Sequence, residues 1–221
     1  MSEKITVLST KQLTDQQTLF LEEAGFSVLS MDFIEIRFLD FSLKKIPSLL
    51  LFTSQNAVKS VVQSPFFKNI QHIPAICVGT KTKEVLQHHG VGVLDCTDYA
   101  EELSSILIAN FSKKNIAFFA GNIRRDTLPD AMRNYNISFT EYTVYQTTQT
   151  PHQINHTPSV VLFYSPSGVR SYLAHNPLKH SQAICIGTTT AQALQGNPSQ
   201  IHISEKATIE SVLEKCRELF G

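Results

Sequence analysis

The sequence predicts an α/β protein made of two similar domains, each with a doubly wound parallel sheet, which face a shared cleft. Two observations lead to this fold class. Short apolar runs alternate with amphipathic stretches along the whole chain, which is the pattern of strands and helices in parallel α/β sheets. One block of sequence also occurs twice, at nearly the same spacing, which indicates a duplicated domain.

The apolar runs are short and uninterrupted, as expected for strands buried on both faces of a sheet. They lie at residues 5–8, 49–52, 75–78, 116–119, 160–163 and 183–186. The stretches between them carry apolar residues at helical spacing. We expect helices at residues 15–24, 57–63, 81–89, 100–111, 128–135, 169–175, 189–195 and 209–219.

The repeat consists of two ordered blocks. Residues 51–58 (LFTSQNAV) align with residues 162–169 (LFYSPSGV) at an offset of 111 residues. Residues 75–87 align with residues 183–195 at an offset of 108, and eight of these thirteen positions are identical. Two blocks in the same order at almost one offset indicate two copies of a domain.

The domain boundaries follow from what the second copy lacks. No strand precedes it, so we expect residues 1–30 to complete a discontinuous domain with residues 149–221. Residues 39–138 would form the other α/β domain. The chain would then cross twice between domains, at residues 31–38 and 139–148, which have β composition and could pair as a two-stranded ladder. Two strands alone are marginally stable, so we expect the domains to move relative to each other.

Composition narrows the class of protein. The chain has 221 residues with 42% hydrophobic and 17% charged residues, as in an ordinary globular protein. Lys plus Arg equals Asp plus Glu at 19 each, and no basic block stands out, which argues against a nucleic-acid partner. We identify neither a signal peptide nor a membrane span. The four cysteines lack CxxC spacing and are expected to be reduced thiols of a cytoplasmic protein.

Small polar residues follow the predicted strands, where doubly wound sheets bind ligands. Any one of them could simply cap the next helix. Five such loops in paired positions favour a surface that holds an anion through hydroxyls and helix amides. The candidates for substrate binding are Thr53, Ser54, Gly79, Thr80, Thr82, Gly121, Asn122, Ser165, Ser167, Gly168, Gly187, Thr189 and Thr190.

The usual catalytic motifs are missing. The sequence contains no GxxxxGK[ST] phosphate loop, no GxGxxG after a strand and no convincing metal-ligand spacing, so we expect no metal site. Asp126 and Asp130 lie beside Arg124, Arg125 and Arg133, which is more typical of a salt-bridged surface than of a catalytic carboxylate pair. The residues alone nominate no acid/base dyad.

The loops in this order resemble the uroporphyrinogen-III synthase family. The resemblance covers about residues 50–215. It is carried by Leu51–Ser54 with Ala57-Val58, by Val78-Gly79 with Thr82, by Gly121-Asn122-Ile-Arg-Arg125, by Val144-Tyr-Gln-Thr147, by Phe163-Tyr-Ser-Pro-Ser-Gly168 and by Ile186-Gly-Thr-Thr-Thr-Ala-Gln-Ala-Leu194.

The resemblance implies two flavodoxin-like domains joined by a two-stranded antiparallel β linker. It also implies a cytoplasmic, cofactor-free hydro-lyase of haem and tetrapyrrole biosynthesis. Such an enzyme converts hydroxymethylbilane to uroporphyrinogen III, with loss of water, ring closure and inversion of ring D. The substrate carries eight carboxylates, which suits a cleft lined by helix N-termini. A monomer that receives its substrate from hydroxymethylbilane synthase, with no membrane partner, fits this implication.

The resemblance assigns roles to individual residues. Tyr145 matches the family tyrosine on the linker side of the cleft, and is the candidate general acid for the departing hydroxyl. Arg125 joins the binding candidates, together with the hydroxyl and glycine residues named above. Two alternatives share the doubled fold. One is a non-enzymatic two-domain protein that binds a small anion, and the other is a flavodoxin-like nucleotide or flavin binder with a phosphate loop at residues 53–56.

Overall fold

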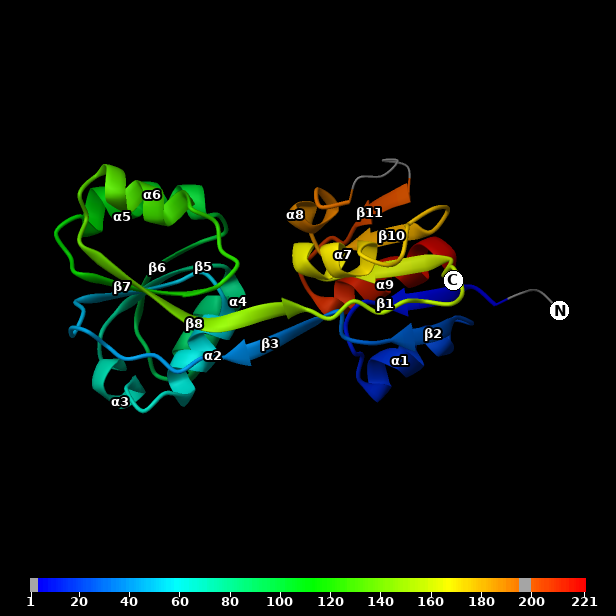
Figure 1. Cartoon of the computed structure of the whole chain (residues 1–221), viewed down its shortest axis with the longest axis horizontal. Helices are drawn as coiled ribbons and strands as arrows, with labels where there is room; N and C mark the ends of the chain where they lie inside the picture. The colour runs from blue at the N-terminus through cyan, green and yellow to red at the C-terminus, as the bar shows by residue number, and fades with distance from the viewer. Residues whose placement is uncertain (1–3, 195–199) are drawn as a thin grey trace. The chain divides into compact units, whose positions relative to one another are not determined.

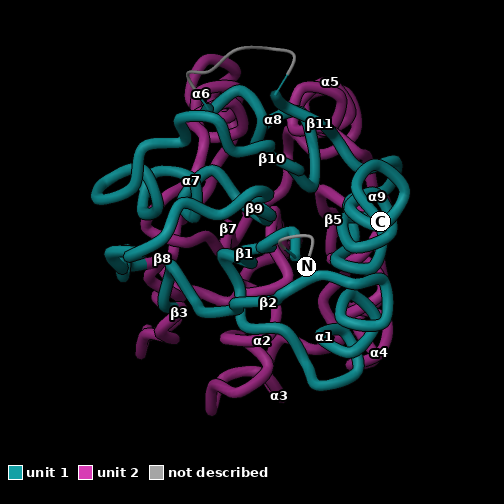
Figure 2. The backbone as a smooth tube through the Cα atoms, turned by 90° about the vertical axis from the view of Figure 1, so that its right-hand side faces the viewer, with its two compact units in different colours: residues 1–35, 148–221 teal, residues 36–147 magenta. Residues whose placement is uncertain are grey.

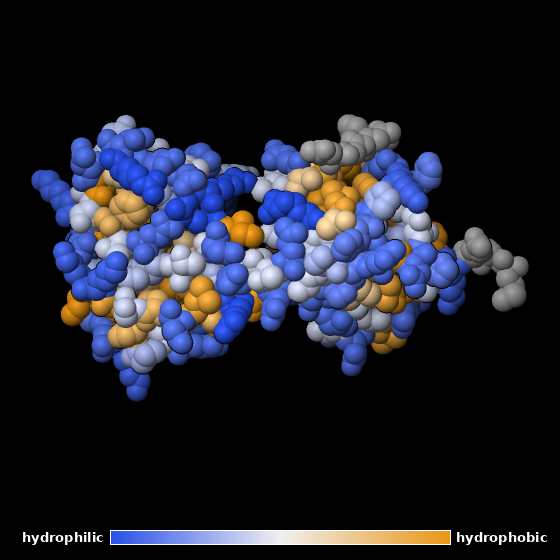
Figure 3. All heavy atoms as spheres, viewed as in Figure 1, coloured by the Kyte–Doolittle hydropathy of each residue, from blue (hydrophilic) through white to orange (hydrophobic). Residues whose placement is uncertain are grey.

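The structure of the protein is a computed structural model that describes residues 4–194 and 200–221. The chain forms two compact units, coloured separately in Figure 2. Unit 1 comprises Met1–Glu35 and Thr148–Gly221, and unit 2 comprises Ile36–Thr147. Within the described residues, no helix is long and apolar enough to cross a membrane. Figure 3 shows hydrophilic residues over most of the visible face of each unit, with apolar residues in small separate groups.

Unit 2 is built on a sheet whose strand order is β3-β8-β7-β4-β5-β6. The strands are β3 (Ile34–Phe38), β4 (Leu49–Phe52), β5 (Ala75–Val78), β6 (Val93–Thr97), β7 (Ile116–Gly121) and β8 (Phe139–Gln149). Strands β4 to β8 run parallel to one another. Strand β3 runs in the opposite direction beside β8, as Figure 1 shows, and the amide of Leu39 donates to the carbonyl of Val144 just beyond it.

Five helices cover the two faces of this sheet. They are α2 (Gln55–Gln63), α3 (Phe67–Ile70), α4 (Thr80–His88), α5 (Ala100–Phe111) and α6 (Thr127–Asn134). Side chains of α2, α3 and α4 pack with one face of β4, β5 and β7, while those of α5 and α6 pack with the other. All four residues of β4 are buried, which explains its purely apolar sequence.

Unit 1 has a five-stranded parallel sheet in the order β11-β10-β9-β1-β2. Its strands are β1 (Thr6–Ser9), β2 (Ser27–Ser30), β9 (Val160–Phe163), β10 (Gln182–Cys185) and β11 (Ile201–Ile203). Helices α1 (Asp15–Glu22) and α9 (Ile209–Phe220) cover one face. Helices α7 (Pro166–Leu173) and α8 (Thr188–Ala191) cover the other.

The two sheets share one strand order once the chain is read in a permuted way. The strands can be numbered from β9 in unit 1, continuing with β1 after β11, and from β4 in unit 2. The five parallel strands of each sheet then lie in the order third, second, first, fourth, fifth, and unit 2 adds β3 beside its fifth strand. Strand β1 then occupies the place of β7, and β2 occupies that of β8. The N-terminal residues therefore complete the unit that the C-terminal residues form, because β1 pairs directly with β9.

The predicted fold class, two α/β domains with parallel sheets, is confirmed. Three strands were not predicted, β2, β6 and β11. They lie at sheet edges, and none of their residues is fully buried, so they do not form a buried apolar run. The short helix α3 was also not predicted. The predicted helix at 189–195 corresponds to α8, which ends at Ala191, and Gln195 lies outside the described residues.

The segments at 31–38 and 139–148 pair with each other as expected, but 139–148 is more than one strand of a two-stranded linker. Strand β8 pairs with β3, but its residues 139–145 also pair with β7 as a full member of the sheet of unit 2. Burial explains the difference, because Tyr142 and Val144 pack into the core beneath α2 and need a covered position.

Candidate functional site

The predicted binding residues of unit 2 lie at one edge of its sheet. Thr53 and Ser54 follow β4, while Gly79, Thr80 and Thr82 follow β5. At the end of β7 lie Gly121 and Asn122, with Arg125 in the loop beyond, and β8 carries Tyr145. The structure brings these groups together because β4, β5, β7 and β8 are parallel, so that their carboxyl ends reach the same edge.

Ser54 is the N-cap of α2 and the centre of a small hydrogen-bond network. Its Oγ accepts the amide of Asn56 at 3.1 Å, which satisfies one of the free amides of the first helical turn. The same oxygen accepts the phenol hydroxyl of Tyr145 at 3.2 Å. Because Oγ is the acceptor in both contacts, the proton of Ser54 remains available for donation to a ligand.

Gly79 caps α4 with a backbone that favours glycine. Its φ is +90°, in the region that side chains rarely adopt. The carbonyl of Gly79 accepts the amide of Thr82 at 2.9 Å, and the amide of Gly79 donates to the carbonyl of Thr97 at 2.8 Å. Thr82 is buried, whereas Thr80 is exposed at the first position of the helix.

Gly121 and Tyr145 are in close contact at the end of β7. A Cβ atom built on Gly121 would lie 2.6 Å from Cε2 and 2.8 Å from the hydroxyl oxygen of Tyr145, and nearer still to Cζ. No side chain fits there without displacing the ring. The glycine therefore lets the phenol lie directly over the backbone, where it is 8% exposed and reaches Ser54.

Asn122 uses its side chain to hold the end of β8. Its Oδ1 accepts the amide of Thr147 at 2.8 Å, and its Nδ2 donates to the carbonyl of Thr147 at 3.2 Å. The backbone amide of Asn122 donates to the backbone carbonyl of Tyr145 at 3.1 Å. This side chain thus continues the ladder beyond β7, and its predicted contact with substrate stays a prediction.

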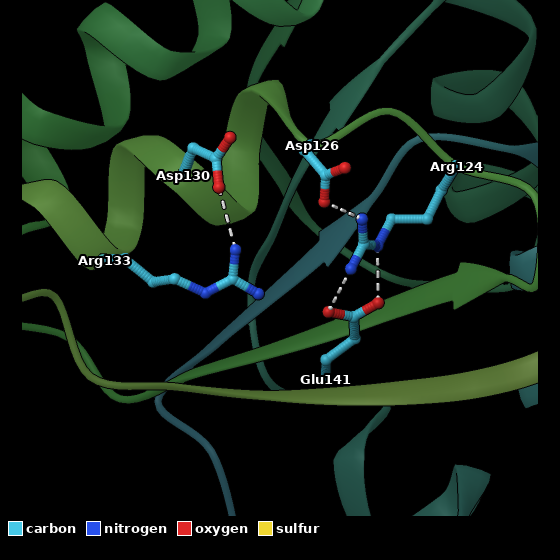
Figure 4. Close-up of polar contacts among 5 residues, drawn as sticks. All are labelled: Arg124, Asp126, Asp130, Arg133 and Glu141. Atoms are coloured by element: carbon cyan, nitrogen blue, oxygen red, sulfur yellow. Dashed lines mark hydrogen bonds and ion pairs between the residues drawn. The ribbon is translucent and has the colours of Figure 1, made fainter.

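The predicted salt-bridged surface beside β7 is confirmed, with one partner that the sequence did not indicate. Figure 4 shows Arg124 between Asp126 and Glu141, and Arg133 paired separately with Asp130. Glu141 lies on β8, and its two oxygens accept from Nε at 2.6 Å and from Nη2 at 3.0 Å of Arg124. This bidentate contact, followed by Asp126, raises the pKa of Arg124 above its usual range. The Arg124 charge is therefore held by two carboxylates of its own unit.

Unit 1 carries a matching cap after β9. Ser165 Oγ accepts the amide of Gly168 at 3.0 Å, and Pro166 occupies the first turn of α7, where no amide is needed. Ser167 is buried, and its hydroxyl accepts from Arg170 at 3.3 Å. The predicted residues Ser165, Ser167 and Gly168 thus lie together at the start of one helix.

The loop after β10 repeats the arrangement at Gly79 with a different backbone. The carbonyl of Gly187 accepts the amide of Thr190 at 3.1 Å, and Thr190 is buried while Thr189 is exposed. The φ of Gly187 is 179°, an extended conformation open to any residue. The duplicated loops share a hydrogen-bond pattern, but only Gly79 has a backbone that favours glycine.

The cysteines are poor candidates for nucleophiles. All four are free, and burial raises the pKa values of Cys77, Cys185 and Cys216 to about 12, with neighbouring Cys96 as a further cause at Cys77. Buried thiols that stay protonated at neutral pH are unreactive. Within residues 4–194 and 200–221, no three His, Cys, Asp or Glu side chains gather where they could hold a metal ion.

Comparison with known proteins agrees with these features. A family model described as uroporphyrinogen-III synthase HemD matches residues 15–214. The uroporphyrinogen-III synthase of Chlorobaculum parvum is 27% identical over 204 residues, which cover 79% of this chain and 81% of that protein. The porphyrin biosynthesis protein HemD of Ruminiclostridium josui is 28% identical over 110 residues, so that the chain matches 22% of that protein's length.

Solved structures show the same fold. The uroporphyrinogen-III synthetase of Helicobacter pylori superimposes with a TM-score of 0.73 at 23% identity, covering 97% of this chain and 99% of that one. A mutant uroporphyrinogen III synthase of Thermus thermophilus gives a TM-score of 0.67 at 14% identity, with 97% and 98% covered. Since the family model spans nearly the whole chain, the protein belongs to the uroporphyrinogen-III synthase HemD family.

Proposed function

We propose that this protein is a uroporphyrinogen-III synthase, which closes hydroxymethylbilane into uroporphyrinogen III with loss of water and inversion of ring D. The match of the family model to residues 15–214 carries the proposal. The two sets of capped, hydroxyl-rich loops support it, because they suit a substrate with many carboxylates. A binder of a flavin or of a small anion is not favoured, since neither accounts for the family match.

The substrate carboxylates would bind at the N-termini of α2, α4 and α7. Each terminus presents amides without helical partners and a partial positive charge, worth about 0.3–1 kcal/mol to an anion. Hydroxyl donors stand beside these amides at Ser54, Thr80 and Ser165. Arg125 would add a formal charge from its exposed position after β7. Several weak sites acting together can hold a flexible polyanion without a strongly basic surface.

The reaction is a dehydration followed by a rearrangement. Protonation of the ring A hydroxyl releases water and leaves an electrophilic azafulvene. The substituted carbon of ring D attacks it to form a spiro intermediate, whose bond to ring C then breaks. The free position of ring D closes the macrocycle and loses a proton, which balances the first step. No net oxidation or reduction occurs, so no redox cofactor is required.

Tyr145 would be the acid that protonates the departing hydroxyl. Its phenol lies at the N-terminal end of α2, hydrogen-bonded to Ser54, and next to the predicted binding loops of unit 2. A general acid must lie within hydrogen-bond reach of the group that it protonates, so the role depends on where this phenol is held. We further propose a cytoplasmic monomer that takes its unstable substrate from hydroxymethylbilane synthase.

The decisive experiment mixes the purified protein with hydroxymethylbilane made in situ and separates the oxidised porphyrin isomers. Type III product is expected, and type I product alone, the spontaneous isomer, would overturn the proposal. Tyr145→Phe should lower kcat about 100-fold, within the range for loss of a general acid. Tyr135→Phe is the matched control, because Tyr135 is 60% exposed at the end of α6 and should keep full activity. A Tyr145→Phe protein with nearly full kcat would remove Tyr145 from its role while leaving the synthase activity intact.

A further inference from the structure

A β-bulge in β8 determines where the Tyr145 side chain points. Ala120 of β7 pairs with Thr143, but the next residue, Gly121, pairs with Tyr145, so that Val144 is an extra residue without a partner on β7. In a regular strand, adjacent side chains point to opposite faces. Here Val144 and Tyr145 are both buried, at 0% and 8% exposure. Bulges redirect side chains in this way, and they are common beside active sites.

Two donors hold the bulge by its carbonyl group. The carbonyl oxygen of Val144 accepts the amide of Leu39 at 2.9 Å and the hydroxyl of Ser60 at 2.5 Å. Ser60 lies in α2 and is 4% exposed, so no water can replace its hydroxyl without opening the core. A short, buried hydrogen bond from a helix therefore fixes the extra residue.

The same helix also holds the phenol. Ser54 at the N-cap of α2 accepts the Tyr145 hydroxyl, and Ser60 lies further along α2, within hydrogen-bond distance of the residue that precedes the tyrosine. Gly121 leaves the space that the ring fills. Helix α2 thus contacts this segment twice, through Ser60 at the Val144 carbonyl and through Ser54 at the Tyr145 hydroxyl. Together the two contacts set the direction of the Tyr145 side chain.

We propose that Ser60 is a positioning residue for Tyr145, which acts through the Val144 bulge and does not itself touch substrate. The inference rests on the proposed role of Tyr145 in the synthase reaction. Without the Ser60 hydroxyl, the Val144 carbonyl loses a buried donor, and the bulge relaxes toward regular pairing, which would turn Tyr145 away from Ser54. A displacement of about 1 Å at a catalytic group can lower a rate about 100-fold.

The test is a cycle of kcat values for the wild type, Ser60→Ala, Tyr145→Phe and the double variant. Ser60→Ala is expected to lower kcat about 10- to 100-fold with little change in KM. In the Tyr145→Phe background it should have no further effect, because the group it positions is already gone. Ser181→Ala is the matched control, since its buried hydroxyl donates to the carbonyl of Pro158 at 2.6 Å in unit 1. Ser181→Ala should lower the free energy of unfolding by about as much as Ser60→Ala and leave kcat unchanged.

A second readout follows the phenol directly. With 3-fluorotyrosine incorporated, the ¹⁹F resonance missing in Tyr145→Phe identifies Tyr145, and Ser60→Ala should shift that resonance while Ser181→Ala does not. An unmoved resonance, or equal loss of kcat in both backgrounds, would overturn the positioning role and leave the proposed function standing. Nearly full kcat in Tyr145→Phe would instead remove the general-acid role, and the ¹⁹F shift would still decide whether Ser60 positions the ring. Type I product alone from the wild type would overturn the synthase assignment itself.

Discussion

Gly121→Ala is the sharpest test of the close packing between β7 and Tyr145. The new Cβ would lie 2.6 Å from Cε2 of the ring and nearer still to Cζ, whereas ordinary contacts begin at 3.4 Å, so the ring must retreat by more than about 0.8 Å. Overpacking of this kind costs about 1–3 kcal/mol. The retreat also stretches the 3.2 Å hydrogen bond to Ser54 beyond its useful range. We therefore expect a loss of about 1–3 kcal/mol in the free energy of unfolding.

Urea unfolding of the wild type, Gly121→Ala, Tyr145→Ala and the double variant measures this effect and assigns it to the ring. In the Tyr145→Ala background the clash disappears, so the added Gly121→Ala should cost less than about 0.5 kcal/mol, as at an independent site. Gly92→Ala is the control, because nothing lies within 4 Å of its added Cβ and its φ is not in the left-handed region. It should be neutral or stabilise slightly, through the reduced entropy of the unfolded chain. Equal destabilisation by Gly121→Ala with and without the Tyr145 ring would refute the reasoning.

Four further outcomes can be checked by simple measurements. Asn176→Ala should lower the free energy of unfolding by about 1–3 kcal/mol, because this buried amide bonds three backbone groups of unit 1, and urea titration will show it. A disulfide reagent at pH 8 should modify only Cys96 in the folded protein and all four cysteines after unfolding. The other thiols have folded pKa values near 12, against 9.0 in the unfolded chain, so the unfolded state ionises first and stability should fall between pH 9 and 12. Glu141→Gln should cost about 1–2 kcal/mol by weakening the bidentate contact with Arg124, and Glu141→Gln as stable as the wild type would show that Asp126 alone satisfies the arginine.

The central strands could be predicted because a strand that is buried on both faces consists of an uninterrupted run of apolar residues. Strands β4, β5 and β9 match their predicted ranges. The edge strands β2, β6 and β11 have no fully buried residue, so they lack the apolar run that marks the central strands. Strand β8 was partly misjudged, because its composition indicates a strand but not which neighbours it pairs with.

The candidate site could be predicted at the level of loops but not of contacts. The loops follow from a general rule, that parallel strands end at one edge of their sheet. The contact between Tyr145 and Ser54 joins residues that lie 91 positions apart, and depends on a bulge that shifts pairing by one residue. The pairing of Arg124 with Glu141 also depends on register, across 17 positions. A single sequence contains no signal for either register.

The permuted repeat explains why the duplication is not symmetric in its chemistry. In unit 1, the chain starts at the strand that corresponds to β7, and the next strand, β2, ends at Ser30. Strand β8 is the counterpart of β2, but it continues to Gln149 and so places Tyr145 opposite Gly121, the last residue of β7. Duplication alone therefore supplies two sets of capping hydroxyls, at Ser54 and Ser165, while the extension of one strand supplies the tyrosine only once. Suppose that both units hold substrate carboxylates and that unit 2 supplies the proton. Ser165→Ala should then weaken substrate binding and change kcat little. Substitutions around Tyr145 should instead lower kcat and change substrate binding little.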